Sequence, residues 1–219
     1  MDMLEAMRQR HSVRRYLDRP IEGETLAALE AEIAACNRAG GLHIQLVCDE
    51  PKAFDSTLAH YGRFAGVKNY LALIGPKGAD LDEKCGYYGE RLVLKAQCLG
   101  LNTCWVALTY KKIPEAFRVE PGERLVIVIS IGYGETQGVP HRGKEAAQVR
   151  EGAGPDWFER GVAAALLAPT AVNQQKFRFR WQDGKVLAKA GIGPCAKIDL
   201  GIVKYHFELG AGKDASIWA

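Results

Sequence analysis

Apolar residues along the chain follow two different periods in turn. Residues 23–38 carry apolar side chains at spacings of three and four, namely Leu26, Leu29, Ile33 and Cys36. This spacing predicts a helix with one apolar face. Over residues 42–46 apolar and polar residues alternate, which predicts a strand. The same two patterns predict further helices at about 2–10, 51–60, 82–99, 112–117, 156–167 and 198–209, and strands at about 70–74, 103–108, 124–131 and 177–181.

The last third of the sequence repeats the pattern of the first half. A shift of 133 residues superimposes the apolar positions of a helix and an alternating strand: Ile33, Ala35, Ile44, Leu46 and Cys48 on Leu166, Ala168, Phe177, Phe179 and Trp181. A strand ending Ile74-Gly75-Pro76 is matched by one expected to end Ile192-Gly193-Pro194. We therefore predict one domain, 1–219, built of two pseudo-symmetric halves, about 1–150 and 151–219. Simple alternation of helices and strands, common in many folds, is the alternative.

Composition is that of an ordinary globular protein. The chain has 219 residues, of which 47% are hydrophobic and 25% charged, so disorder is excluded. No apolar run approaches the roughly 20 residues of a membrane span, and the first residues lack the apolar core of a signal peptide. The six cysteines form no Cys-x-x-Cys pair. We therefore expect a cytoplasmic protein with reduced thiols and no membrane partner.

Several catalytic signatures are missing from the sequence. It contains no Gly-x-Ser-x-Gly elbow, no P-loop and no His-Glu-x-x-His, and its five histidines lack metal-ligand spacing, so we expect no metal. Gly132-Tyr133-Gly134 follows a very hydrophobic strand, as a dinucleotide-binding loop would. However, Val139-Pro140 follows where that loop would open a helix, so we interpret it as a turn.

One basic segment near the N-terminus has the chemistry of a phosphate site. Arg10, Ser12 and Arg14 occupy alternate positions, so in an extended segment all three side chains point the same way. Two guanidinium groups and a hydroxyl can hold a phosphate through charge-assisted hydrogen bonds. The alternative is that these arginines are simply solvated surface residues.

A second polar segment lies between a predicted helix and a predicted strand. It reads Ala168-Pro169-Thr170-Ala171-Val172-Asn173-Gln174-Gln175, with small side chains that let the backbone approach a flat ligand. Asn and Gln supply donors and acceptors for such a ligand's edge. Taken alone, the segment favours a plain helix-to-strand connection with a proline after the helix.

Together these segments resemble the FMN-dependent nitroreductase family. Four motifs carry the resemblance: Arg10-His11-Ser12-Val13-Arg14 followed by Tyr16; Pro169-Thr170-x-x-Asn173-x-Gln175; Leu99-Gly100-Leu101 leading into a strand; and Gly132-Tyr133-Gly134 followed by Arg142 and Lys144. In most of the family the Pro-Ser loop follows the first long helix, where this chain has Cys36 to Gly41 without the motif. That order is similar to a smaller branch in which one chain contains both halves of the fold.

The resemblance implies an α+β fold: a three-layer α/β/α arrangement with a central, mostly antiparallel sheet. It also implies bound FMN, transient NAD(P)H, and ping-pong hydride transfer through flavin N5 to a nitroaromatic, quinone or similar small molecule. The ordinary family is dimeric, so a chain holding both halves is expected to be a monomer. No side chain is expected to act as a catalytic nucleophile.

The resemblance further implies a set of FMN contacts. Arg10, Ser12 and neighbouring His11 would contact the phosphate or ribityl chain, and Arg142 and Lys144 would hold the phosphate. Arg14 would approach the pyrimidine edge, with Arg63 a second candidate there. The exit of the strand, at Ala107 and Leu108, would offer a backbone N–H to N5. The remaining expected contacts line the ring: Pro169, Thr170, Ala171 and Asn173.

Three other functions are compatible with parts of the sequence. A non-catalytic flavin-binding protein would keep the cofactor without turnover. Another FMN-dependent reductase, such as a reductive dehalogenase, would share the same motifs. A nucleic-acid module using Arg8 to Arg15 is disfavoured, because the net charge is only +3 and Tyr16 is the single interleaved aromatic residue.

Overall fold

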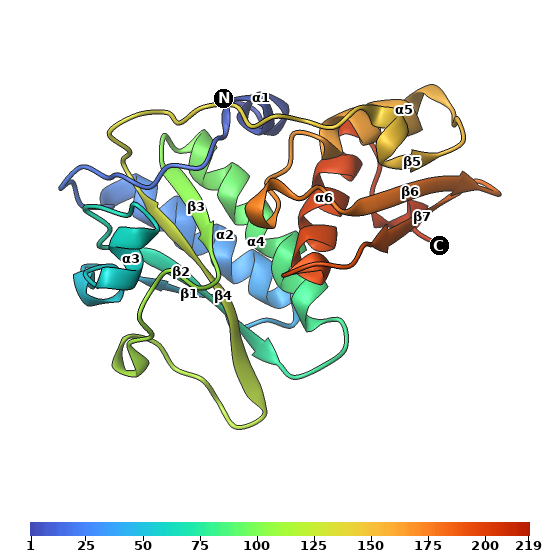
Figure 1. Cartoon of the computed structure of the whole chain (residues 1–219). Coiled ribbons are helices and arrows are strands. Elements are labelled where there is room, and N and C mark those ends of the chain that lie inside the picture. Colours follow the sequence, from blue (N-terminus) through green and yellow to red (C-terminus); the bar gives the residue numbers. More distant parts are fainter. The chain divides into compact units, whose positions relative to one another are not determined.

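Helices and strands are mixed along the whole chain (Figure 1). The computed structural model describes residues 1–219 with the exception of the Leu58 side chain. The α-helices within this description are α1 (Met3–Gln9), α2 (Gly23–Gly40), α3 (Thr57–Tyr61), α4 (Leu81–Cys98), α5 (Asp156–Ala165) and α6 (Ala196–Ala211). The strands are β1 (Gln45–Val47), β2 (Tyr70–Pro76), β3 (Asn102–Val106), β4 (Glu123–Gly132), β5 (Arg150–Glu151), β6 (Phe177–Gln182) and β7 (Lys185–Ala190). The predicted α+β class is confirmed.

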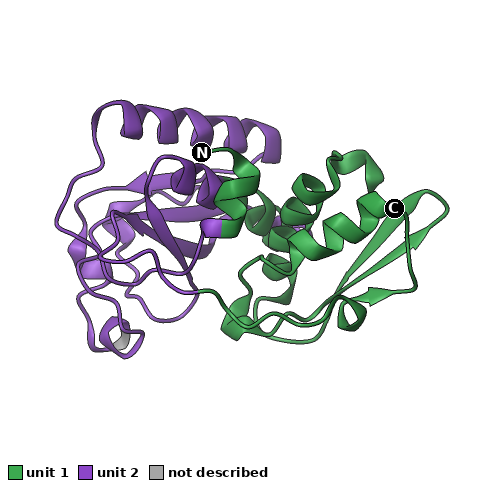
Figure 2. Ribbon diagram, turned by 90° about the horizontal axis from the view of Figure 1, so that it is seen from above, with its two compact units in different colours: residues 1–8, 82–91, 140–219 green, residues 9–81, 92–139 purple. Residues whose placement is uncertain are grey.

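The chain divides into two compact units that interleave in sequence (Figure 2). Unit 1 consists of Met1–Arg8, Asp82–Arg91 and Pro140–Ala219. Unit 2 consists of Gln9–Leu81 and Leu92–Val139. Each unit contains its own sheet.

Unit 2 is organised around an antiparallel sheet with strand order β1-β2-β4-β3. Its inner strand β4 is the most hydrophobic stretch of the sequence, and β2 is buried from Tyr70 to Gly75. A strand buried on both faces carries a continuous apolar run rather than an alternating one. Phe54, Phe64 and Tyr110 pack with these strands in one apolar cluster, which also includes Val13 and Tyr16 of the N-terminal segment.

Unit 1 joins two packed helices to a small sheet with strand order β5-β6-β7. β5 pairs parallel to β6, and β6 pairs antiparallel to β7. Gly161 of α5 allows close packing, since a Cβ there would lie 2.6 Å from the Phe207 ring of α6. The rings of Phe179 and Trp218 also stack near Phe207, so one aromatic core holds the helices against the sheet.

Several predicted elements differ at their ends. The helix expected over 51–60 is a 3-10 turn at Pro51–Ala53 followed by α3, and the helix expected over 112–117 is the 3-10 turn Pro114–Ala116. The strand expected to end at Ile192 stops at Ala190, and Ile192 is 94% exposed. Gly191, Gly193 and Pro194 explain that end, because glycine weakens a strand and proline cannot donate to a ladder.

The internal duplication stays a prediction. Helix, two antiparallel strands and a long helix occur in the order α2-β1-β2-α4 and again as α5-β6-β7-α6. The surroundings differ, because β2 has β4 as a further neighbour, whereas β7 has only an isolated bridge from Val186 to Trp218.

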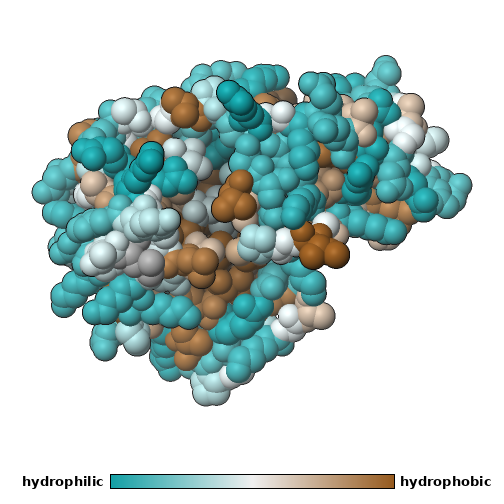
Figure 3. All heavy atoms as spheres, viewed as in Figure 1, coloured by the Kyte–Doolittle hydropathy of each residue, from teal (hydrophilic) through white to brown (hydrophobic). Residues whose placement is uncertain are grey.

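No helix in the described part of the chain is long and apolar enough to cross a membrane. The visible surface in Figure 3 is mostly hydrophilic, with separate apolar areas. The most exposed large apolar side chains, at 79% or more, are Tyr61, Leu108, Val139, Val172 and Ile192.

Candidate functional site

The Arg10–Arg14 motif lies in an extended segment of unit 2, fixed at two points by backbone hydrogen bonds. The Val13 amide donates to the Thr103 carbonyl of β3 at 3.0 Å, and Ser12 and Thr103 form a parallel bridge. Three residues further on, the Tyr16 amide donates to the Ala65 carbonyl at 3.0 Å. The extended conformation expected from the sequence is therefore present.

The side chains of Arg10, Ser12 and Arg14 all act on the Cys104 thiol. Burial raises the pKa of this thiol, while the charge of Arg14, a hydrogen bond with the Ser12 side chain and the charge of Arg10 act in the opposite direction. The Ser12 hydroxyl is hydrogen-bonded to this thiol, and the two arginines lie within electrostatic range of it. That the three side chains hold a phosphate stays a prediction.

The three residues differ in their exposure to solvent. Arg10 is 4% exposed, Ser12 is half-buried and Arg14 is exposed, with its guanidinium carbon 5.9 Å from the centre of the Phe64 ring. A largely dehydrated guanidinium acts through a lower dielectric than a surface one. The cluster thus combines strong positive charge, a hydroxyl and restricted side chains, which is the chemistry required to hold a phosphate.

The other expected contacts in unit 2 differ in burial and backbone conformation. His11 is half-buried, and a Cβ at Gly138 would lie 2.8 Å from the His11 Cβ. Ala107 and Leu108 follow β3 directly and are exposed. Arg63 lies after α3 with a left-handed backbone (φ 62°), and among the described residues its side chain forms no hydrogen bond or ion pair.

In unit 1, the buried Gln175 side chain connects two of the sequence motifs. Its amide nitrogen donates to the Arg142 carbonyl at 2.7 Å and to Asn173 Oδ1 at 2.8 Å. Its amide oxygen accepts from the Lys144 amide at 2.8 Å. The Pro169–Gln175 loop and the Arg142–Lys144 segment therefore form one hydrogen-bonded structure.

Further contacts complete this structure. Lys144 Nζ donates to the Gln175 carbonyl at 2.8 Å, and Asn173 Nδ2 donates to the Arg142 carbonyl at 2.9 Å. Thr170 Oγ1 accepts from the Gln175 amide at 3.0 Å. The motif residues Thr170, Asn173 and Gln175 thus stabilise the loop itself, while the exposed Arg142 side chain is left available for an anion.

The loop contains unusual backbone conformations. Val172, Asn173 and Gln175 have φ of 45°, 54° and 45°, in the left-handed region. Such conformations are uncommon for residues other than glycine and rarest for β-branched ones, and they are concentrated at functional sites. Hydrogen bonds from both sides hold this loop in place.

Sequence reasoning identified both clusters but missed their central residues. Cys104 was noted only as part of the strand that follows Leu99-Gly100-Leu101, Gln175 only as the last member of its motif, and Asp199 carried no motif. Asp199 is 3% exposed and accepts hydrogen bonds from the Ala171 amide and from Gln174. Because these contacts depend on tertiary packing, no local signal indicated them.

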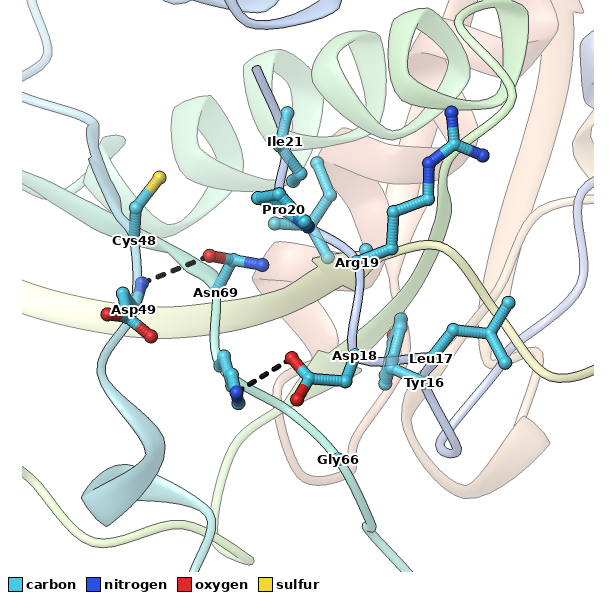
Figure 4. Close-up of a pocket in the computed structure, with 13 residues that line it drawn as sticks. Tyr16, Leu17, Asp18, Arg19, Pro20, Ile21, Cys48, Asp49, Gly66 and Asn69 are labelled. Carbon is cyan, nitrogen blue, oxygen red and sulfur yellow. Dashed lines mark hydrogen bonds and ion pairs between the residues drawn. The ribbon is translucent and has the colours of Figure 1, made fainter.

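A separate pocket of about 250 Å³ lies in unit 2 beside residues 16–21 (Figure 4). Lys68 and Asp18 form an ion pair at 2.7 Å on its wall, and Asn69 Oδ1 accepts from the Asp49 amide at 3.1 Å. Cys48 also contributes to the lining. None of the expected flavin contacts lines this pocket, so it is distinct from the candidate site.

Within the described part of the chain, no group of three or more His, Cys, Asp or Glu side chains is arranged to hold a metal ion. Gly132 ends β4, Gly134 bridges to Tyr16, and a loop follows instead of a helix. Gly132-Tyr133-Gly134 is therefore a turn and has no helix N-terminus for a dinucleotide.

A mixed fold with an antiparallel sheet, an extended cationic segment and a strained polar loop defines an α+β protein suited to an anionic cofactor. The family model described as "Putative TM nitroreductase" matches residues 2–211. The chain belongs to this nitroreductase family.

Solved structures show the same fold. A "putative nitroreductase" from Thermotoga maritima MSB8 is 22% identical with a TM-score of 0.67, covering 96% of this chain and 83% of its own. A "putative nitroreductase" from Desulfovibrio desulfuricans, in complex with FMN, is 22% identical with a TM-score of 0.55, covering 71% of this chain and 99% of its own. A nitroreductase family protein from Streptococcus pneumoniae TIGR4 is 14% identical with a TM-score of 0.55, covering 69% and 100%. No curated protein matches the chain.

Proposed function

We propose that this protein binds FMN and uses it to transfer hydride from NAD(P)H to a small electron acceptor. The observation that supports this most directly is the extended segment with Arg10, Ser12 and Arg14 at alternate positions, fixed to β3 by the bonds of Ser12 and Val13 with Thr103. Family membership and the FMN found with the Desulfovibrio desulfuricans protein agree with the proposal.

The donor set fits the negatively charged parts of FMN. In unit 2, Arg10 and Ser12 would bind the phosphate or the ribityl chain beside His11, and Arg14 would approach the pyrimidine edge. Arg63 is the second candidate for that edge. In unit 1, the Arg142 guanidinium and the Lys144 ammonium would add charge for the phosphate. Arg10, Ser12, Arg14 and Arg63 belong to unit 2, and Arg142 and Lys144 belong to unit 1.

The remaining contacts would be made largely by backbone and small side chains. Ala107 and Leu108 would offer a backbone N–H from the exit of β3, and Pro169, Thr170 and Ala171 would lie against the flat ring. Asn173, whose amide is engaged within the loop, would support that loop.

FMN supplies the chemistry, because N5 of its ring accepts a hydride and passes it to an acceptor. The role of the chain is to bind, orient and stabilise charge. The fixed cation of Arg14 would stabilise negative charge that develops at the pyrimidine, and it would do so without reorganisation. Neither a nucleophilic side chain nor a separate dinucleotide fold is required. A nitroaromatic or a quinone would bind after the oxidised nicotinamide has left.

An absorption spectrum of the purified protein tests the proposal. We expect yellow protein with about one FMN per chain, or stoichiometric uptake of added FMN by apoprotein. Mixing with NADPH and then NADH under anaerobic stopped flow should bleach the flavin, and a quinone or nitroaromatic should restore its colour. Protein that neither contains nor takes up FMN would refute the proposal.

The same experiment separates the two flavin-based alternatives. A non-catalytic flavin-binding protein would take up FMN but would not bleach with either nicotinamide. A reductase of another type, such as a reductive dehalogenase, would bleach and would then be reoxidised by a halogenated substrate.

Two further features belong to the proposal. The predicted combination of both halves in one chain implies a monomer, and light scattering of the FMN-loaded protein measures this directly. A cytoplasmic location would supply NAD(P)H and keep the cysteines reduced.

A further inference from the structure

The Pro169–Gln175 loop holds a conformation that its own backbone disfavours. Val172, Asn173 and Gln175 all lie in the left-handed region. Each such residue raises the free energy of the folded state and persists only where the surroundings determine it. A contact outside the loop is therefore expected to fix it.

The Asp199 carboxylate makes that contact from the first turn of α6. Its Oδ1 accepts from the Ala171 amide at 2.9 Å, and its Oδ2 accepts from Gln174 Nε2 at 2.6 Å. The same Gln174 nitrogen donates to the Pro194 carbonyl at 2.7 Å. Both carboxylate oxygens are thus used by the residues that flank Val172 and Asn173.

The buried carboxylate of Asp199 carries an unfavourable desolvation free energy. It is 3% exposed, and no lysine, arginine or histidine of the described chain pairs with it. Burial raises its pKa, and the hydrogen bonds from Gln174 and Ala171 act in the opposite direction. An unpaired buried carboxylate destabilises a fold unless its hydrogen bonds compensate. Here those hydrogen bonds go to the loop alone.

We propose that Asp199 is the positioning residue of the flavin-binding loop, holding Ala171 and Gln174 so that the loop keeps its flavin-binding shape. The proposal rests on the proposed function, because the loop's role toward FMN comes from there. Asp199 itself would not touch the cofactor.

Glu208 provides a matched control on the same helix. It is also buried, and burial likewise raises its pKa. Its carboxylate accepts from Tyr87 Oη and Trp218 Nε1, both at 2.5 Å, and makes no contact with the loop. Asp199→Asn and Glu208→Gln therefore each neutralise one buried carboxylate of α6, but only the first changes the loop.

The test compares both variants with wild type in the full chain. For Asp199→Asn we expect the Kd for FMN to rise about tenfold, which is the effect of losing one hydrogen bond to a charged group. For Glu208→Gln the Kd should stay within about twofold of wild type. The visible circular dichroism of the bound flavin should change in Asp199→Asn alone.

A second variant changes the same contact from the loop side. Gln174→Ala leaves α6 intact and should also weaken FMN binding. Its effect should not add to that of Asp199→Asn in the double variant, because both remove one interaction. Hydrogen exchange of apoprotein should be faster over 170–175 in both single variants and unchanged there in Glu208→Gln.

The outcomes separate the role of Asp199 from the proposed FMN-dependent function. Wild-type protein that binds FMN, with Asp199→Asn equal to it in Kd, dichroism and exchange, overturns the role of Asp199 and leaves the proposed function standing. Equal losses in Asp199→Asn and Glu208→Gln also overturn it, since they indicate general destabilisation. Wild-type protein that binds no FMN refutes the proposed function and the positioning role together.

Discussion

Single side chains in this protein divide between those that are exposed to solvent and those that hold the backbone in place. Thr170, Asn173 and Gln175 belong to one short motif, yet their polar atoms bind one another and the Arg142–Lys144 segment. Arg14 and Arg142, in contrast, present exposed guanidinium groups. A motif can therefore mark a conformation as well as a contact.

Arg10→Ala should weaken FMN binding. Loss of a charge-assisted hydrogen bond costs about 1.5–3 kcal/mol, which is roughly 10- to 150-fold in Kd. Titration of apoprotein with FMN, followed by flavin fluorescence, measures the change. Arg15→Ala is the control, because Arg15 is exposed and pairs with Glu135. Because Arg10 is buried, thermal unfolding of Arg10→Ala and of the milder variant Arg10→Lys checks that the fold is intact. Unchanged FMN affinity in Arg10→Ala would exclude a phosphate contact.

Gln175→Ala should lower the free energy of unfolding by about 1–3 kcal/mol, because it leaves buried partners without a hydrogen bond. The Lys144 amide and the Arg142 carbonyl both lose contacts to this side chain. Urea unfolding measures the effect. Gln182→Ala, at an exposed position of β6, should change stability by less than about 0.5 kcal/mol; equal effects at both positions would contradict the central role of Gln175.

At the scale of elements, the sequence predicted the long helices and the hydrophobic strands well. The apolar periodicity of α2 and the apolar run of β4 depend on burial, which local pattern reports directly. The end of β7 was misplaced, because Ile192 is apolar but fully on the surface. The clusters around Cys104 and Gln175 could be predicted only as motifs, since their contacts join residues up to about 90 positions apart in the chain.

The Pro169–Gln175 loop gives a prediction at this scale. Val172→Gly should raise the free energy of unfolding of the apoprotein by about 1 kcal/mol, because glycine adopts the left-handed region without strain. The valine side chain is 88% exposed, so its removal loses little packing. Val139→Gly is the control: it is 79% exposed with an ordinary φ, and it should be neutral or destabilising. Urea unfolding of both variants decides between strain and simple side-chain loss.

For the molecule as a whole, the buried carboxyl groups of Asp199 and Glu208 make the free energy of unfolding depend on pH. Burial raises the pKa of Asp199 and of Glu208 in the folded state. Between the ordinary carboxyl value and the raised one, the folded protein keeps protons that the unfolded chain has released. These two groups therefore favour the folded state most at low pH and lose that contribution as pH rises through the folded pKa values.

The double variant Asp199→Asn/Glu208→Gln should remove this effect. We expect the free energy of unfolding of wild type, measured relative to the variant, to fall as pH rises above about 4, the ordinary carboxyl pKa. Urea unfolding at several pH values provides the curves. Parallel curves would show that neither carboxyl titrates differently in the folded and unfolded states.

The pocket beside residues 16–21 places Cys48 where a chemical probe can reach it. Cys48 is exposed, whereas Cys36, Cys85 and Cys104 are buried and Cys98 and Cys195 are intermediate. Burial of its sulfur, with Glu30 and Asp49 nearby, raises the pKa of Cys48, so labelling with a maleimide should be selective but needs mildly alkaline buffer. A fluorophore at this native position would give an optical signal from unit 2 that is independent of flavin absorbance, without any engineered cysteine.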